Sequence, residues 1–119
     1  NNTNASFMTS DNFVIQAKPN APIIEGQKVE FEGSLVILGD VNDGAEVIAG
    51  ENIIVLGDLR GLAHAGAKGN KEAIIAASSI EAPQLRISNI IKEREREEIL
   101  ESTQKTYAYV DADGKMELE

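Results

Sequence analysis

Hydrophobic residues come in short runs along the middle of the chain, and each run ends near a glycine, asparagine or aspartate. Two stretches align without a gap at a period of 18 residues: LVILGDVNDGAEVIAGEN from Leu35 and IIVLGDLRGLAHAGAKGN from Ile53. A fixed period of this size in an apolar, glycine-punctuated segment predicts stacked repeats. Because such a coil divides into three sides of about six residues, each long enough for one short strand, we predict an all-β solenoid with triangular coils.

The repeat extends beyond these two copies. Residues 25–33 align with residues 43–51, and short apolar runs follow at 73–79 and 84–90, which indicates about four coils within 13–90. Glycine supplies the backbone freedom that the corners need, and asparagine or aspartate tolerates the same conformations. In this register three pairs of residues coincide: Ala45 with Ala63, Glu46 with His64, and Asn52 with Asn70.

One side of the predicted coil is apolar on both of its faces. In the runs 35–38 and 53–56 alternate residues point inward, but the outward residues are hydrophobic as well. A strand that is apolar on both faces needs a cover on its outer face. We therefore predict a homodimer, and its face comprises Val36, Leu38, Ile54 and Leu56.

The two ends of the chain differ from the repeat. Residues 1–12 are polar and are expected to form a disordered leader or linker, and 13–119 form one domain. The charged segment 91–104, IKEREREEILESTQ, predicts a helix with ion pairs at helical spacing. Residues 105–119 predict a β-hairpin with its turn at Asp113-Gly114.

Composition narrows the classes of partner. The 119 residues carry 20 acidic and 11 basic side chains, for a net charge of -9, so nucleic acid and anionic lipid are poor direct partners. Aromatic residues make up 4% of the chain, so the core must consist of aliphatic side chains. Without cysteine there is no disulfide and no thiolate metal site, and no apolar run approaches the roughly 20 residues that span a bilayer.

Few side chains suggest catalysis or metal binding. His64 is the only histidine and has no partner at a catalytic or metal-ligand spacing, so a structural role is expected. Asp40, Asp43 and Asp58 carry the oxygen ligands that calcium prefers, but corner capping explains their positions better. Arg60 either binds a carboxylate of an acidic peptide or forms hydrogen bonds within its own corner. We expect neither a cofactor nor a metal.

Three functional classes fit a solenoid of this kind. The first is a binding and dimerisation module without enzymatic activity. The second is a structural protein that polymerises, as bactofilins do. The third is a β-helix enzyme, because hexapeptide acyltransferases also use 18-residue coils, although this chain has no acid-base constellation around His64. Catalysis is therefore not expected.

The central segment 33–70 resembles the C-terminal domain of the MinC family of septum site-determining proteins. The family pattern is carried by Gly39-Asp40-Val41-Asn42 and Gly44-Ala45-Glu46-Val47-Ile48-Ala49, followed by Leu59-Arg60-Gly61 and Ala65-Gly66-Ala67. With looser agreement in the flanks, the resemblance covers residues 22–119.

The resemblance implies a right-handed triangular β-helix that dimerises through one face and belongs to a regulator of cell division. It implies two protein partners: the membrane-attached ATPase MinD, and the C-terminal tail of the tubulin-like protein FtsZ, whose assembly the family inhibits. The protein would then be cytoplasmic and would reach the inner face of the membrane only through MinD. The separate N-terminal inhibitory domain of the family is not expected within residues 1–119.

The family also suggests residues that contact partners. Its R-S-G-Q stretch, associated with MinD, appears here as Ile24-Glu25-Gly26-Gln27, so only Gly26 and Gln27 carry over. Glu51 is a displaced counterpart of an acidic corner residue that contributes to MinD binding in some members. Arg60 is a further candidate for partner binding, although the second arginine of the family's R-G-R is Leu62 here.

Overall fold

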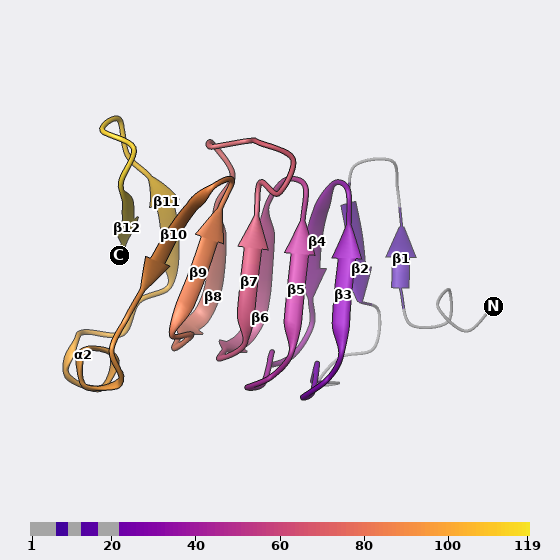
Figure 1. The fold of residues 1–119 in the computed structure, drawn as a ribbon. Helices are drawn as coiled ribbons and strands as arrows, with labels where there is room; N and C mark the ends of the chain where they lie inside the picture. Colours follow the sequence, from indigo (N-terminus) through magenta and orange to yellow (C-terminus); the bar gives the residue numbers. More distant parts are fainter. Residues whose placement is uncertain (1–6, 10–12, 17–21) are drawn as a thin grey trace.

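The computed structural model describes residues 7–9, 13–16 and 22–119, and these form a solenoid of stacked strands with a short helix and a hairpin at its C-terminal end (Figure 1). The strands are β1 (Phe7–Thr9), β2 (Phe13–Gln16), β3 (Lys28–Phe31), β4 (Ser34–Ile37), β5 (Glu46–Ala49), β6 (Ile53–Leu59), β7 (Leu62–Ala65), β8 (Ile75–Ile80), β9 (Gln84–Ile87), β10 (Ile90–Glu93), β11 (Tyr107–Val110) and β12 (Met116–Leu118). The helix is α2 (Arg96–Glu101).

The strands form two sheets that face each other across the core (Figure 1). Sheet A has the order β1-β2-β4-β6-β8-β11-β12, and sheet B has the order β10-β9-β7-β5-β3. A third side is held by parallel backbone pairing from Ile23 to Val41, Leu59 and Ile80 in successive coils. The described residues complete about three turns, and β9 begins a further one that β10 ends by turning back. The predicted all-β solenoid is confirmed.

The core is a stack of aliphatic side chains in which each inward position meets its equivalent in the next coil. Strands β4, β5, β7 and β9 all alternate between half-buried and buried residues, as expected when only one face of a strand points inward. On sheet A, Leu35, Ile53 and Ile75 stack and are completely buried. On sheet B, small Ala63 fits between Val47 and Leu85, so the layers interlock without large aromatic rings.

The predicted gapless register is correct for the first step of the stack and wrong for the second. Between the first two coils, partners are 18 residues apart, as in Ser34 and Asn52. In the next step Val47 pairs with Ala63 rather than Ala65, and Glu46 pairs with Leu62 rather than His64. The corner at Arg60-Gly61 is shorter than its predecessor, so the chain enters β7 two residues early. The loop 66–74 is then longer than its predecessor by more than the lost length, so that the offset rises to 22 and Asn52 lies level with Ile74 rather than Asn70.

A two-residue slip escapes detection in the sequence for a physical reason. Side chains on a strand alternate with a period of two, so a shift by one residue exchanges the inward and outward faces, whereas a shift by two preserves them. Ala63 and Ala65 are buried in the observed register just as the 18-residue register predicts. The hydrophobic pattern therefore identifies the buried face without identifying the partner across the ladder.

Two predictions about the ends of the chain are wrong. Part of the leader expected to be disordered, Phe7–Thr9, forms strand β1 and pairs with β2, whereas 1–6 and 10–12 lie outside the described residues. The helix expected over 91–104 is confined to Arg96–Glu101, because Ile90–Glu93 forms β10. Ser88, with a φ of 59°, begins a two-residue turn that folds β10 back against β9. Pairing with a sheet edge therefore outweighs the helical preference of these residues.

The C-terminal hairpin is confirmed. Strands β11 and β12 pair antiparallel around a turn that contains Gly114 at a φ of 82°, and β11 also pairs with β8. The hairpin therefore extends sheet A beyond the last coil and covers its end. No helix in the described part of the chain is long and apolar enough to cross a lipid bilayer.

Candidate partner-binding surfaces

The outer face of sheet A is predominantly aliphatic. The structure places on it all four residues that were expected to point outward: Val36, Leu38, Ile54 and Leu56. Leu56 is the most exposed of them, at 59% of its surface. The face continues across the next strands, because Ile54 pairs with Ala76 and Ala76 with Tyr107. Neighbouring strands thus present one continuous apolar surface.

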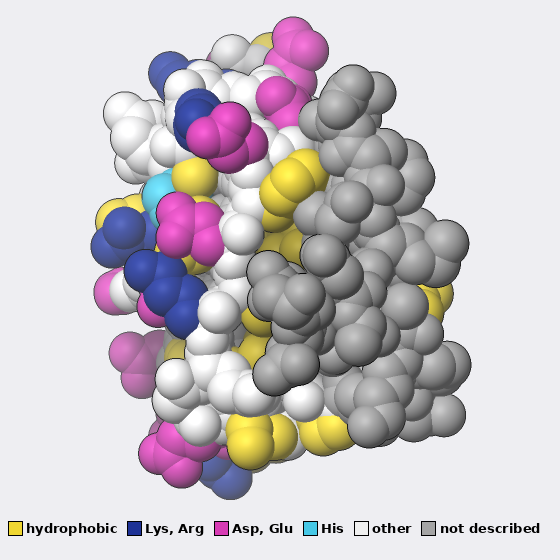
Figure 2. Space-filling model, turned by 90° about the vertical axis from the view of Figure 1, so that its right-hand side faces the viewer, with side chains coloured by type: hydrophobic (Ala, Val, Ile, Leu, Met, Phe, Trp, Pro, Cys, Tyr) yellow, Lys and Arg dark blue, Asp and Glu magenta, His cyan; other side chains and the backbone are white. Residues whose placement is uncertain are grey.

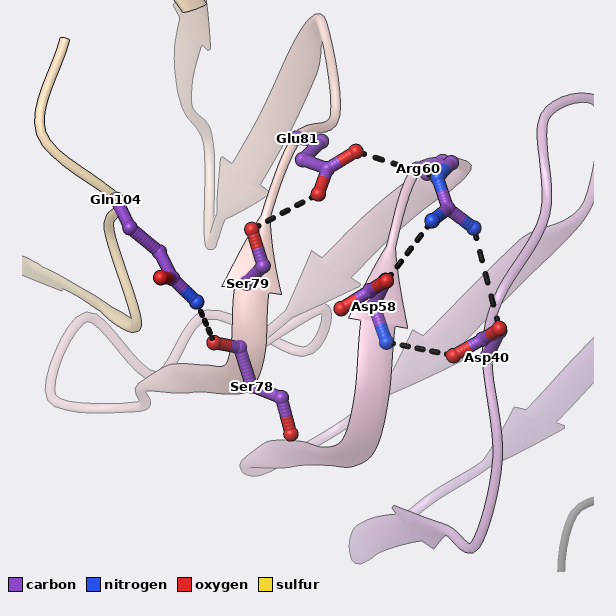
Figure 3. Close-up of polar contacts among 7 residues, drawn as sticks. All are labelled: Asp40, Asp58, Arg60, Ser78, Ser79, Glu81 and Gln104. Carbon is purple, nitrogen blue, oxygen red and sulfur yellow. Dashed lines mark hydrogen bonds and ion pairs between the residues drawn. The ribbon is translucent and has the colours of Figure 1, made fainter.

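The third side has a charged outer surface that is organised by Arg60 (Figure 3). The Arg60 guanidinium donates through Nη2 to Asp58 Oδ2 at 2.8 Å and through Nε to Glu81 Oε1 at 3.2 Å, and Asp40 Oδ2 lies 3.9 Å from Nη1. Asp40 also accepts a hydrogen bond from the Asp58 backbone N–H at 2.8 Å, which is the corner-capping role expected for it. Ser79 Oγ donates to Glu81, so the network joins three successive coils.

These contacts satisfy Arg60 within the chain. Burial acts to lower the pKa of the Arg60 guanidinium, but the carboxylates of Glu81, Asp58 and Asp40 together outweigh it and hold the pKa above its usual value. An acidic peptide that reached Arg60 would meet three carboxylates around one cation. The arrangement therefore favours hydrogen bonding within the corner over capture of a foreign carboxylate. Glu81 was missed in the sequence because it lies 21 residues from Arg60.

Gly26 and Gln27 form a corner that leads from the third side into sheet B. Gly26 has a φ of 85°, and its N–H donates to the carbonyl of Gly44, the equivalent glycine of the next coil. Gln27 Oε1 accepts a hydrogen bond from the Ile24 backbone N–H at 2.8 Å. Both residues are exposed, so this corner combines a structural role with access for a partner. Ile24, which stands where the family has arginine, is 50% exposed.

Glu51 lies at the opposite end of the sheet B strands. Its backbone N–H donates to the carbonyl of Gly33, and its side chain accepts a hydrogen bond from Asn70 Nδ2 at 2.5 Å. Gln27 precedes β3, whereas Glu51 follows β5, so the two are separated by the length of a four-residue strand, about 13 Å. The structure therefore does not bring these candidates into one cluster. It places them at opposite ends of the strands of sheet B.

The outer face of sheet B lies between these two sets of strand ends. Paired positions across its strands run from Glu30 to Ile48, His64, Arg86 and Ile91. The half-buried His64 has its Nε2 2.8 Å from the carbonyl oxygen of Ser88, which is a structural contact of the kind expected for it. Along the left-hand edge of Figure 2, which is this face, charged side chains alternate with hydrophobic ones. The sequence did not single out Arg86.

Arg94 anchors the segment that leaves the last coil. Its side chain is 7% exposed, and it donates to the Ile80 carbonyl at 3.0 Å and to Ser102 Oγ at 3.4 Å. Burial lowers the pKa of the Arg94 guanidinium below its usual value, and the charge of Glu98 acts in the opposite direction. Arg94 therefore ties α2 to the third side, although α2 itself has no buried residue. A hollow of about 340 Å³ lies between them and includes Leu100, which is 71% exposed.

No cluster of three or more histidine, cysteine, aspartate or glutamate side chains suited to a metal ion occurs in the described part of the chain. The surfaces of the three sides thus differ in chemistry: sheet A is apolar, the third side is a self-satisfied ionic network, and sheet B is mixed. Surfaces of this kind are suited to protein contacts.

Comparison with known proteins identifies relatives of the whole solenoid. The family described as septum formation inhibitor MinC, C-terminal domain, matches residues 19–119. Septum site-determining protein MinC of Bacillus subtilis is 46% identical over 94 residues, which are 79% of this chain and 41% of that protein. The probable MinC of Geobacillus thermodenitrificans is 61% identical over 66 residues, or 56% of this chain and 29% of that protein.

A solved structure agrees with these relatives. The MinC:MinD cell division protein complex of Aquifex aeolicus contains a chain that matches 92% of this chain with a TM-score of 0.80 and 34% sequence identity, over 86% of that chain. The chain described here spans less than half the length of the curated relatives named above.

Proposed function

Because the chain belongs to the family of MinC C-terminal domains, we propose that it is the partner-binding and dimerisation module of a cell-division regulator that acts on the choice of septum site. The observation that carries this proposal is the structural match, over nearly the whole chain, to a protein solved in a MinC:MinD complex. The family comprises regulators of division rather than a known class of enzyme.

The proposed partner is MinD, which would recruit the module to the inner face of the membrane. Gly26-Gln27 and Glu51 lie at opposite ends of the strands of sheet B, so a partner that contacts both must cover the outer face of that sheet. This placement supports sheet B as the docking face for MinD. The test is co-sedimentation of the chain with MinD, ATP and lipid vesicles. Failure to sediment in a MinD- and ATP-dependent manner would overturn the proposal.

The second proposed activity is binding of the FtsZ C-terminal tail. Arg60 is the candidate from the sequence, but a carboxylate of the tail would have to displace Glu81 or Asp58 to reach it. Fluorescence anisotropy with a labelled tail peptide tests this assignment on the intact chain. A dissociation constant that Arg60→Gln leaves unchanged would remove Arg60 from the site while leaving tail binding itself in place.

The third proposed activity is homodimerisation through the outer face of sheet A. An aspartate at Ile54 would bury a charge in the interface, so Ile54→Asp should yield monomers in sedimentation equilibrium while the coil stays folded. Ile24→Asp is the control, because Ile24 is 50% exposed and lies at the corner before β3, outside sheet A. An Ile54→Asp variant that stays dimeric would exclude this face, and filaments of the wild-type chain would favour a bactofilin-like polymer.

A further inference from the structure

Arg86 differs from the other arginines that lie against the solenoid. Arg60 has three carboxylates around it and Arg94 has a carbonyl and a hydroxyl, whereas no hydrogen bond or ion pair joins the side chain of Arg86 to any other described residue. Its Nε is buried and lacks a hydrogen-bond acceptor. A buried donor without an acceptor is unfavourable, and a charged donor more so. The residue as a whole is only half-buried, so the terminal amino groups of the guanidinium can still form strong, geometrically specific bonds with a carboxylate from outside the chain.

The surroundings of Arg86 are those of an interface centre rather than of a solvated surface. Arg86 pairs with His64 on one side and with Ile91 on the other, and Ile48 lies beyond His64 in the same ladder. Ile91 is 49% exposed, which is unusual for an isoleucine on a strand. The nearest acidic side chain on this face, Glu93, is engaged by Gln84 Nε2 at 3.1 Å. A cation flanked by exposed aliphatic side chains is typical of residues that dominate the energy of a protein interface.

We propose that Arg86 is an anchor residue of the docking face on sheet B, and that it binds a carboxylate which MinD presents between apolar side chains that pack on Ile48 and Ile91. The proposal rests on the proposed function and adds a residue and a chemistry to it. The outer face around Arg86 is continuous with the strand ends that carry Gln27 and Glu51, because β5 and β9 are separated only by β7. Carboxylate binding also accounts for specificity: a partner with a lysine at this point would be repelled.

The same observations separate this role from a structural one. Because the Arg86 side chain donates to no described residue, replacement by glutamine removes no side-chain bond within the described part of the chain, whereas a structural arginine would lose its bonds. Arg86→Gln should therefore leave the urea midpoint of unfolding unchanged or raise it slightly. A lowered midpoint would mean that Arg86 supports the fold, and it would overturn the proposal.

The binding experiment uses the full chain, MinD, ATP and lipid vesicles. Arg86→Gln should weaken vesicle recruitment at least tenfold, and Arg86→Lys should recover part of the loss, because lysine keeps the charge but not the bidentate geometry. Lys115→Gln is the control: it also removes one positive charge, but from the exposed turn of the hairpin that extends sheet A, and it should have little effect. The affinity of wild type should also fall more steeply with salt than that of Arg86→Gln.

The outcomes distinguish the two proposals. If wild type is not recruited, the proposed MinD partnership fails. If wild type is recruited and Arg86→Gln binds equally well, or if Lys115→Gln weakens recruitment as much, the anchor role of Arg86 is refuted while the partnership stands. If Arg86→Gln weakens binding of the FtsZ tail peptide but not of MinD, the carboxylate belongs to the tail and the assignment to MinD is overturned.

Discussion

The first step of the solenoid, from β3 and β4 to β5 and β6, differs in register from the second, from β5 and β6 to β7 and β8. The first keeps an 18-residue offset on both sheets, as in Val29 with Val47. The second contracts to 16 residues on sheet B, as in Val47 with Ala63, and expands to 22 on sheet A, as in Ile53 with Ile75. Both steps nevertheless bury the same kind of residue. Stacking thus depends on parity within each strand and on volume, whereas the connections between sides absorb changes in length, including the single residue by which the offset falls from 22 at Val55 to 21 at Asp58.

The irregular second step is also the one whose strands are linked by the ion pairs of Arg60. The short corner at Arg60-Gly61 brings the guanidinium beside Asp58 and Glu81 of successive coils, whereas the corresponding corner of the first step contains Asn42. The regular step is held by its backbone ladder and by hydrogen bonds from Asn52 to Ser34 Oγ, whereas the irregular step has an ionic network in addition to its ladder. Three experiments test this difference, from the largest expected effect to the smallest, and a fourth concerns the hairpin at which the stack ends.

The short corner should tolerate no side chain at Gly61. An added Cβ would lie 2.5 Å from the Ala45 carbonyl oxygen and 2.6 Å from that of Asn42, so Gly61→Ala should lower the free energy of unfolding by about 3 kcal/mol. Gly69→Ala is the control: it has open space but a φ of 109°, and should cost about 1 kcal/mol. Urea unfolding measures both. Equal losses would mean that the corner relaxes and that its shortness carries no constraint.

The ionic network should stabilise the second step measurably. Arg60→Gln removes the bonds to Asp58 and Glu81 and leaves the carboxylates to repel one another, so the free energy of unfolding should fall by about 1 kcal/mol, a value already reduced for the 36% exposure of Arg60. Lys68→Gln breaks a more exposed pair, with Glu32, and should cost less. The Arg60 loss should shrink at high salt. A loss that is independent of salt would indicate packing rather than charge.

The loop 66–74, between β7 and β8, should tolerate insertions better than any other part of the second step. Two glycines inserted between Lys68 and Gly69, which are both exposed, should cost no more than about 0.6 kcal/mol. The same insertion between Arg60 and Gly61 should cost several times more, because it interrupts the hydrogen bonds of Gly61 and Leu62 to the preceding coil. Thermal unfolding of the two variants compares them directly. Similar melting temperatures would contradict the distinction between corner and loop.

The smallest effect concerns the hairpin, where stacking ends. Tyr109 Oη donates to Glu119 Oε2 at 2.7 Å, and this hydrogen bond, with desolvation and the charge of Glu119, raises the pKa of Tyr109 to about 12. The stabilisation from this raised pKa is therefore present below pH 10 and is lost as the pH rises towards 12, because the unfolded chain ionises first. Ultraviolet titration of tyrosinate should detect the shift, and Glu119→Gln should reduce it. An unchanged titration curve in that variant would exclude Glu119 as the cause.

The sequence was informative wherever a local rule applied. Alternation assigned the inward and outward residues of β4 and β6 correctly, and the turn at Gly114 placed the hairpin. The sequence was uninformative wherever the structure of a segment depended on which strand pairs with it. The residues of β10 have helical composition but pair with β9, and Glu81 and Arg86 carry no local signal that sets them apart. The candidate residues Gln27, Glu51 and Arg60 were identifiable, but their separation over two sides was not.

What the sequence determined by itself was the solenoid, its aliphatic core and the apolar outer face of sheet A, because these follow from periodicity and from the chemistry of single residues. What only the tertiary structure decided was the register of the second step, the carboxylates that satisfy Arg60 and the lack of a carboxylate partner for Arg86 among the described residues. The reason is that a slip of two residues leaves every inward side chain inward, so the pattern of hydrophobic residues is the same before and after it. The contacts between charged side chains of different coils change with that slip, and they are what distinguishes a corner held within the chain from a face available to a partner.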